Sequence, residues 1–253
     1  MYKMNIDGGV LQAFETTVEN KKVALENDDV NVEVNEIVVF KRSTKYIKYL
    51  NLFIKRIIDI VGSLVGIAFL IPLIIVVKFA YVLDKDYGPV IFSQERVGLN
   101  GKKFKMYKFR SMVMNADEEL EILLSNNEKL KNEYLEYKKL QNDPRITKVG
   151  KFLRKTSIDE FPQFINIFQG KMSLVGPRAY LPNEIDEMGR YYNIIIKCKP
   201  GLTGLWQVNG RSNVTFAERL NMDVEYYKTN NVISDCELLL KTFLVVLNRE
   251  GAR

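Results

Sequence analysis

The chain has 253 residues, with 37 lysines and arginines against 31 acids, and it contains no histidine. The missing histidines exclude catalysis by a histidine acid or base, histidine-activated serine or cysteine nucleophiles, and most zinc sites. Any catalysis must therefore use carboxylates and arginine or lysine, and any metal involved should be a hard ion. The length favours one domain with appendages, and 47% hydrophobic residues suffice for a core.

Charge is distributed unevenly along the chain. Residues 1–40 carry eight acids and three lysines, a net charge of −5, which leaves +11 on the remainder. We interpret residues 1–40 as an acidic N-terminal arm, disordered or loosely structured, in which the segment VNVEVNEIVVF favours a short strand. The basic body favours anionic partners such as phospholipid head groups, nucleotides or nucleic acid.

Residues 41–88 combine a basic flank with an apolar segment. The uncharged stretch from Ile60 to Val77 has 18 residues, which as a helix would span about 27 Å against roughly 30 Å of hydrocarbon. Pro72 lies inside it and predicts a kink. Both flanks are basic, and Lys55 and Arg56 end the first one. Because lysine and arginine favour the cytoplasmic side, a helix that enters, bends at Pro72 and returns fits better than a single pass.

Residues 89–253 are predicted to form the cytoplasmic domain. Two strand-like runs around Asn100-Gly101 predict a β-hairpin over residues 90–110. Residues 115–141 are predicted to form one solvated amphipathic helix. Residues 235–249 form a very apolar helix, either buried in the core or lying in the bilayer interface.

The adjacent acids Asp159 and Glu160 are the strongest candidates for chemistry. Ser157 and Glu160 match a helix capping box, but Pro162 would then fall inside the helix, beyond its first turn. A helix beginning near Pro162 instead leaves both acids at its positive N-terminal end. A carboxylate nucleophile is already ionised at pH 7 and needs no histidine base.

The chain from about Lys55 to Arg249 resembles the bacterial sugar transferases, the monotopic phosphoglycosyl transferases. The matching segments are KRIIDIVGS (55–63), VIFSQERVG (90–98), FKMYKFRSM (104–112), NDPRITKVGKFLRKTSIDEFPQFINIFQGKMSLVGPR (142–178), KPGLTGLWQVNGR (199–211) and LNMDVEYY (220–227). The resemblance implies an irregular α+β fold, a small membrane-docked domain with interfacial helices around a short sheet. It also implies that the apolar segment is a re-entrant helix bent at Pro72.

The implied reaction moves a sugar-1-phosphate from a UDP-sugar to a polyprenyl phosphate, usually undecaprenyl phosphate, and releases UMP. Such a reaction initiates a surface glycan at the cytoplasmic face of the bacterial inner membrane, among membrane lipids and without nucleic acid. By the resemblance, Asp159 is the nucleophile that forms a covalent phosphosugar intermediate, and Glu160 is the Mg²⁺ ligand. An oxygen-ligated Mg²⁺ and nearby cations would offset the repulsion between carboxylate and diphosphate.

Four further residues are predicted to support the site. Arg211, in the turn Asn209-Gly210-Arg211, is the first candidate for a substrate phosphate, and Arg178 is the second. Arg154 and Asp223 are expected to pair and brace the acid pair, because the matching family positions are charged.

Other readings remain open from the sequence. One is a non-catalytic, membrane-anchored module that binds anionic lipid or nucleic acid. Another is a glycosyl transferase that moves the sugar alone and releases UDP. The identity of the sugar and the oligomeric state, for which a homodimer is one option, are not encoded in a recognisable pattern.

Overall fold

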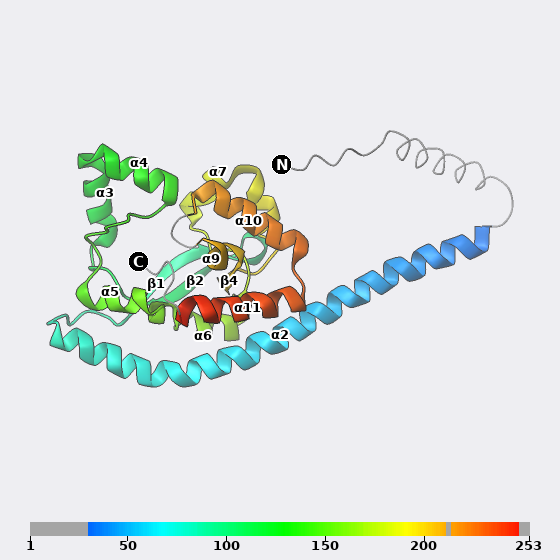
Figure 1. Ribbon diagram of the computed structural model, residues 1–253, viewed down its shortest axis with the longest axis horizontal. Helices are drawn as coiled ribbons and strands as arrows, with labels where there is room; N and C mark the ends of the chain where they lie inside the picture. The colour runs from blue at the N-terminus through cyan, green and yellow to red at the C-terminus, as the bar shows by residue number, and fades with distance from the viewer. Residues whose placement is uncertain (1–29, 211–213, 248–253) are drawn as a thin grey trace. The chain divides into compact units, whose positions relative to one another are not determined.

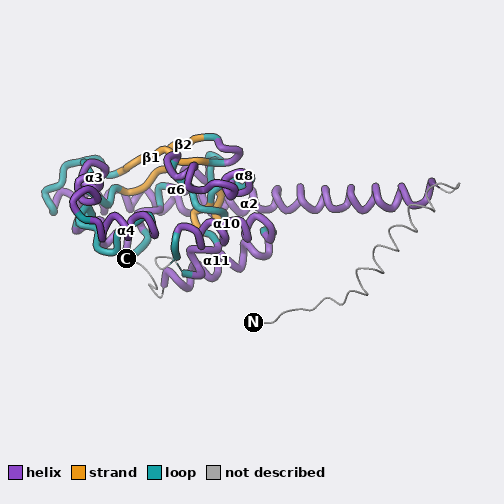
Figure 2. Tube along the Cα trace, turned by 90° about the horizontal axis from the view of Figure 1, so that it is seen from above, coloured by secondary structure: helices purple, strands orange, loops and turns teal. Residues whose placement is uncertain are grey.

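The computed structural model describes residues 30–210 and 214–247, and the chain divides into two compact units between Leu52 and Phe53. The helices over these residues are α2 (Val30–Leu83), α3 (Ala116–Asn126), α4 (Glu128–Tyr137), α5 (Lys148–Lys155), α6 (Gln163–Phe168), α7 (Ile185–Met188), α8 (Tyr192–Ile195), α9 (Leu205–Asn209), α10 (Phe216–Thr229) and α11 (Val232–Leu247). The strands are β1 (Ile91–Val97), β2 (Lys103–Phe109), β3 (Ser173–Val175) and β4 (Gly201–Thr203). The described residues are thus mostly helical, as Figures 1 and 2 show.

The expected short sheet is present as two separate two-stranded sheets over the described residues. β1 and β2 pair antiparallel, and the predicted hairpin is confirmed. Asn100 and Gly101 both have positive φ, 56° and 76°, which is why this dipeptide favours the turn. β3 and β4 pair parallel, and Val175 lies opposite Thr203. Strand β2 contacts the turn that contains the acid pair.

Helix α2 continues without a break through Pro72, and its part within the Phe53–Arg253 unit curves along the underside of that unit in Figure 1. A proline inside a helix removes one backbone hydrogen bond and bends the helix without having to end it. By length and composition α2 is able to cross a membrane. The entry and return of the chain within a bilayer stays a prediction.

One face of α2 is attached to the rest of the Phe53–Arg253 unit along its length. Asp59 is buried and accepts hydrogen bonds from the Ser173 hydroxyl at 3.0 Å and the Leu174 amide at 2.8 Å. Gly66 permits close approach, because a Cβ there would lie 2.3 Å from the ring of Phe164. These contacts hold the helix against β3 and α6.

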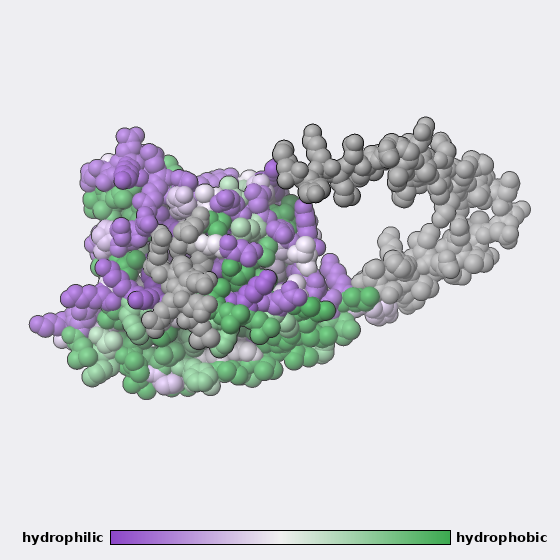
Figure 3. Space-filling view, viewed as in Figure 1, coloured by the Kyte–Doolittle hydropathy of each residue, from purple (hydrophilic) through white to green (hydrophobic). Residues whose placement is uncertain are grey.

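The opposite face of α2 is apolar and exposed. Its large exposed side chains are Ile57, Val61, Leu64, Val65, Phe69, Ile71, Ile75, Val76, Phe79, Val82 and Leu83. Figure 3 shows them as a hydrophobic band beneath a mainly hydrophilic body. A continuous apolar surface of this kind is typical of contact with a membrane or a partner.

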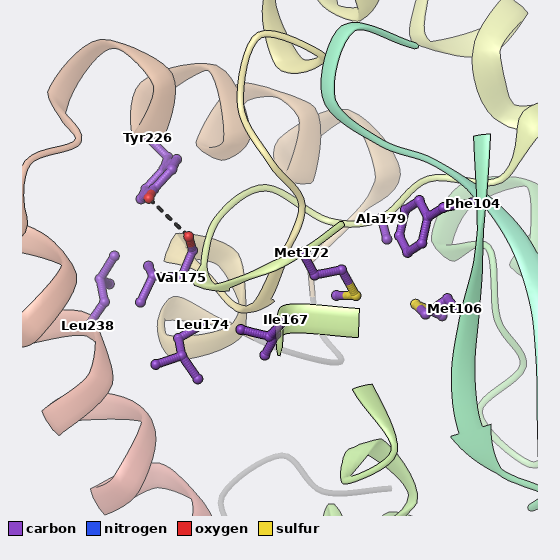
Figure 4. Packing of buried hydrophobic residues seen from close by; sticks show 9 residues of the cluster. All are labelled: Phe104, Met106, Ile167, Met172, Leu174, Val175, Ala179, Tyr226 and Leu238. Carbon is purple, nitrogen blue, oxygen red and sulfur yellow. Dashed lines mark hydrogen bonds between the residues drawn. The ribbon is translucent and has the colours of Figure 1, made fainter. Parts of the chain in front are cut away.

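Helix α11 is partly buried in the core, and its position in a bilayer interface stays a prediction. Leu238 is buried, whereas Leu240, Phe243 and Leu244 are exposed. Leu238 belongs to a cluster with Ile167, Leu174 and residues of β2, drawn in Figure 4, where the Tyr226 hydroxyl donates to the carbonyl of Val175. This cluster joins α11 and α10 to the sheets.

A second hydrophobic cluster joins α2 to the segment that carries the acid pair. Its buried members are Leu70, Val77, Tyr81, Phe109 and Leu153, and Ile158 packs against them. The cluster therefore links the apolar helix to the residue immediately before Asp159.

Two sequence-based expectations are wrong. The segment VNVEVNEIVVF is not a strand but the first part of α2, which starts at Val30; a helix completes its own backbone hydrogen bonds without a neighbouring strand. The helix expected over residues 115–141 is two helices, α3 and α4. They separate at Asn127, whose side chain caps α4 by accepting from the Leu130 amide at 3.1 Å.

Candidate active site

Strand β2 places a lysine beside the acid pair. The buried side chain of Asn166, on α6, accepts from the Tyr107 amide at 3.0 Å and donates to the Lys105 carbonyl at 2.8 Å. This clamp fixes β2 against α6. Lys108 follows directly, and its ammonium nitrogen lies 2.8 Å from Oε1 of Glu160.

Helix α5 supplies the second cation of the site. Thr147 caps the helix by accepting from the Gly150 amide at 3.0 Å. Arg154 lies in the last turn, and its Nε donates to the Ser111 hydroxyl at 2.9 Å. The positive charge of Arg154 lowers the pKa of Asp159 and so favours its ionised form.

The acid pair occupies a short 3-10 turn, η2 (Ile158–Glu160), just before α6. Pro162 is the N-cap of α6, so the expected helix start is confirmed. Ser157 adopts a left-handed conformation with φ 56° and makes no side-chain cap, so the capping-box alternative does not apply. The two carboxylates of this turn differ in exposure to solvent: Asp159 is buried, whereas the Glu160 side chain is 37% exposed.

Burial raises the pKa of Asp159 to about 6. Lys108 and Arg154 act in the opposite direction and favour the carboxylate, whereas Glu160 raises the pKa further. A desolvated carboxylate that is still ionised at neutral pH is more basic than one in water, and is therefore a stronger nucleophile.

The expected pair of Arg154 with Asp223 is wrong. Asp223 lies on α10, fully buried, and accepts from the Tyr180 hydroxyl at 2.7 Å and from the Arg178 amide at 3.1 Å. Burial raises the pKa of Asp223 to about 7. Asp223 thus holds the loop after β3 in place, whereas Arg154 bonds to Ser111.

Arg178, the second phosphate candidate, lies beside Trp206. Its guanidinium carbon is 5.7 Å from the Trp206 ring centre, and that of Arg219 is 4.7 Å from the same ring. The Nε of Arg178 is buried and makes no hydrogen bond among the described residues. Arg211, the first phosphate candidate, lies outside the described residues.

Lys55 and Arg56, predicted as membrane residues, bind the protein itself. Lys55 forms an ion pair with Asp235 of α11 and donates to the carbonyl of Val175 at 2.9 Å. Arg56 donates to the carbonyls of Ile167 and Phe168, both at 2.8 Å, at the end of α6. They attach the start of the apolar helix to the body.

The residues of the site supply only part of a Mg²⁺ shell, and water or substrate oxygens would complete it. Over the described part of the chain, no three His, Cys, Asp or Glu side chains are grouped so that they could enclose a metal. Mg²⁺ often takes one or two carboxylates and completes its shell with phosphate oxygens and water. Glu160, partly exposed and adjacent to Asp159, matches that donor set.

Two residues of the site were not singled out from the sequence. They are Lys108 and Ser111. Both lie in FKMYKFRSM, a segment that carries the family resemblance. Their position in that segment was the available signal.

The chain is similar in sequence to proteins of one known family. The family model described as "Bacterial sugar transferase" matches residues 50–249. The "Undecaprenyl-phosphate galactose phosphotransferase" of Salmonella typhimurium is 43% identical over 218 residues, which are 86% of this chain and 45% of that protein. The "UDP-glucose:undecaprenyl-phosphate glucose-1-phosphate transferase" of Escherichia coli is 35% identical over 221 residues, 83% of this chain and 44% of that protein.

A shorter relative is covered almost completely. The "Exopolysaccharide production protein ExoY" of Rhizobium meliloti is 38% identical over 198 residues, 78% of this chain and 87% of that protein. The chain thus spans about half the length of the first two relatives and most of the third. Because the family model covers most of the chain and includes the acid pair, the chain belongs to the bacterial sugar transferase family.

Proposed function

We propose that the protein transfers a sugar-1-phosphate from a UDP-sugar to a polyprenyl phosphate, namely undecaprenyl phosphate, and releases UMP. The observation that carries the proposal is Asp159, a buried carboxylate of raised pKa between Lys108 and Arg154. The names of the two longer relatives, a galactose phosphotransferase and a glucose-1-phosphate transferase that both use undecaprenyl phosphate, support the choice of substrates. They favour this reaction over the non-catalytic binding module.

The reaction proceeds in two displacements at one phosphorus atom. A carboxylate oxygen of Asp159 bonds to the β-phosphorus of the UDP-sugar, and the bond from that phosphorus to the bridging oxygen breaks, so that UMP leaves with the electron pair. A phosphate oxygen of the polyprenyl phosphate then attacks the same phosphorus and displaces Asp159. Neither step needs a proton from the protein, which suits a chain without histidine.

The main task of the other residues is charge neutralisation. Lys108 and Arg154 favour the ionised Asp159 before attack, and Arg178 is the candidate cation for the leaving phosphate. Glu160 is the proposed Mg²⁺ ligand, and a bound Mg²⁺ would offset negative charge on the diphosphate. Preorganised cations of this kind lower the barrier for phosphoryl transfer.

We expect wild-type protein in membranes or nanodiscs to release UMP when given polyprenyl phosphate, Mg²⁺ and the correct UDP-sugar. The donors to compare are UDP-galactose, UDP-glucose and their N-acetylated forms, since the described site does not reveal which sugar is used. The nucleotide product should be separated by chromatography. UDP as the product, with the sugar alone on the lipid, would overturn the proposal in favour of a glycosyl transferase.

We also propose that the apolar face of α2 lies in the cytoplasmic leaflet of the inner membrane and that both of its ends remain inside the cell. The attachment of its other face to β3 and α6 supports this, because a straight crossing would break the contacts of Asp59 and Gly66. The basic flanks support it independently. A homodimer remains compatible with this arrangement.

The orientation has a direct test in intact cells. After Cys198 and Cys236 are replaced by serine, single cysteines at Lys48 and Lys85 should resist an impermeant thiol reagent and react once the cells are lysed. Labelling at only one of the two positions from outside would indicate a helix that spans the membrane.

A further inference from the structure

We propose that Lys108 is a resident counterion of Glu160, which a divalent cation displaces, and that the displaced ammonium then binds a phosphate of the donor. The inference rests on the proposed function. It assigns Lys108 two successive partners, first a carboxylate and then a phosphate. Lys108 would thereby order the binding of metal and donor.

The first state is visible in the structure. The Lys108 ammonium lies 2.8 Å from Oε1 of Glu160, and the two side chains are 29% and 37% exposed. This pair occupies the carboxylate that the metal requires. A cation bound to the same oxygen would meet the lysine charge at close range, and like charges at that distance repel strongly. Metal binding to Glu160 therefore requires that the lysine move.

The backbone of Lys108 has little freedom to move when its ammonium group leaves Glu160. Lys108 pairs with Phe92 in the hairpin, and the neighbouring Tyr107 amide is held by Asn166 at 3.0 Å. Only the flexible four-carbon stem is able to swing. The ammonium therefore stays near the acid pair after displacement.

The position of Asp159 indicates what the displaced ammonium meets. Of the charged neighbours that favour the ionised Asp159, Lys108 has the largest effect. A phosphorus atom within bonding reach of Asp159 brings its phosphate oxygens into the range of the lysine stem. A diphosphate is thus the partner that the chemistry supplies once Glu160 is occupied by the metal.

The two states predict that removing the lysine has opposite effects on metal binding and on donor use. Lys108→Met should strengthen metal binding without donor, because the competing ammonium is absent. The same change should weaken the use of donor at saturating Mg²⁺, because a phosphate ligand is lost. A residue that served only to stabilise the fold would weaken both.

The test measures Mn²⁺ binding by electron paramagnetic resonance on the full chain in nanodiscs, without donor. We expect Lys108→Met to lower the Kd for Mn²⁺ roughly 3- to 10-fold, the effect of removing one partly exposed ion pair and its repulsion. Lys105→Met is the matched control, since Lys105 lies on the same strand, is exposed, and is paired in register with Glu95 rather than with the acid pair. It should bind Mn²⁺ as wild type, and Glu160→Gln should bind it more weakly.

The second measurement is the KM for the UDP-sugar at saturating Mg²⁺, which should rise at least tenfold in Lys108→Met and stay unchanged in Lys105→Met. Lys108→Gln replaces the methionine variant if that one fails to fold. An unchanged or weaker Mn²⁺ affinity in the lysine variant, equal gains in both lysine variants, or no Mn²⁺ binding by any variant would each overturn the inference. Loss of the proposed function would appear separately, as absence of UMP from wild-type protein.

Discussion

Asp159→Asn should abolish UMP release while leaving the protein folded. The substitution keeps the shape of the side chain and removes the proposed nucleophile, so the rate should fall by at least about three orders of magnitude. The measurement is the initial rate of UMP release from the UDP-sugar. Retention of most of the wild-type rate would refute the role of Asp159.

The same variant should be at least as stable as wild type, which separates catalysis from folding. The folded pKa of Asp159 lies near 6, above its ordinary value of 3.8, so ionisation of Asp159 destabilises the folded protein. The wild type should lose up to about 3 kcal/mol relative to the variant as pH rises from about 4 to about 6, and keep that difference above pH 6. Thermal unfolding at pH 5 and pH 7.5 checks the sign.

The raised pKa also predicts how the wild-type rate depends on pH. Only the ionised carboxylate attacks, so the first displacement should slow about tenfold for each pH unit below about 6. A single-turnover experiment with UDP-sugar alone isolates that step. A rate that is constant down to pH 4.5 would contradict the assignment of this pKa to the attacking group.

Gly150→Ala should have the second-largest effect on UMP release, because it displaces the backbone near the acid pair. An added Cβ at Gly150 would lie 1.9 Å from the carbonyl oxygen of Ser111. That oxygen already accepts from the Thr147 amide at 3.1 Å, so it is not free to retreat. Helix α5 must then move away from the end of β2, and the hydrogen bond between Arg154 and Ser111 must break.

The expected result is destabilisation of about 1–3 kcal/mol or more and a loss of UMP release of about 100-fold, because small displacements of catalytic groups are costly. Lys151→Ala is the control, since Lys151 is the next residue of the same helix and is exposed. It should leave both the melting temperature and the rate near wild type. Normal activity in Gly150→Ala would show that α5 tolerates a shift of Arg154.

The parts of the fold that depend on local chemistry were predictable from the sequence. The hairpin follows from Asn100-Gly101, whose residues tolerate positive φ. The position of the acid pair before α6 follows from Pro162, which is compatible with a helix start but not with a helix interior. In both places a few consecutive residues determine the backbone.

Long-range partners were not predictable in the same way. The basic residues Lys55 and Arg56 resembled a flank facing lipid, but their partners, Asp235 and two carbonyls of α6, are more than 100 residues away. The pairing of Asp223 with Arg154 was expected because the matching family positions are charged, whereas packing places Asp223 against Tyr180. Charge patterns show that partners are needed but do not show which ones the fold brings near.

The cluster that joins α2 to Ile158 has a practical consequence for anyone who wants a water-soluble form of this enzyme. Cutting the chain after Leu83 would remove Leu70, Val77 and Tyr81, and water would then reach Phe109 and Leu153, which belong to the cluster that packs against Ile158. Removing α2 to gain solubility should therefore also cost activity, because the same apolar helix supports the cluster next to Asp159. Detergent or lipid should accordingly be present during every activity assay and not only during storage.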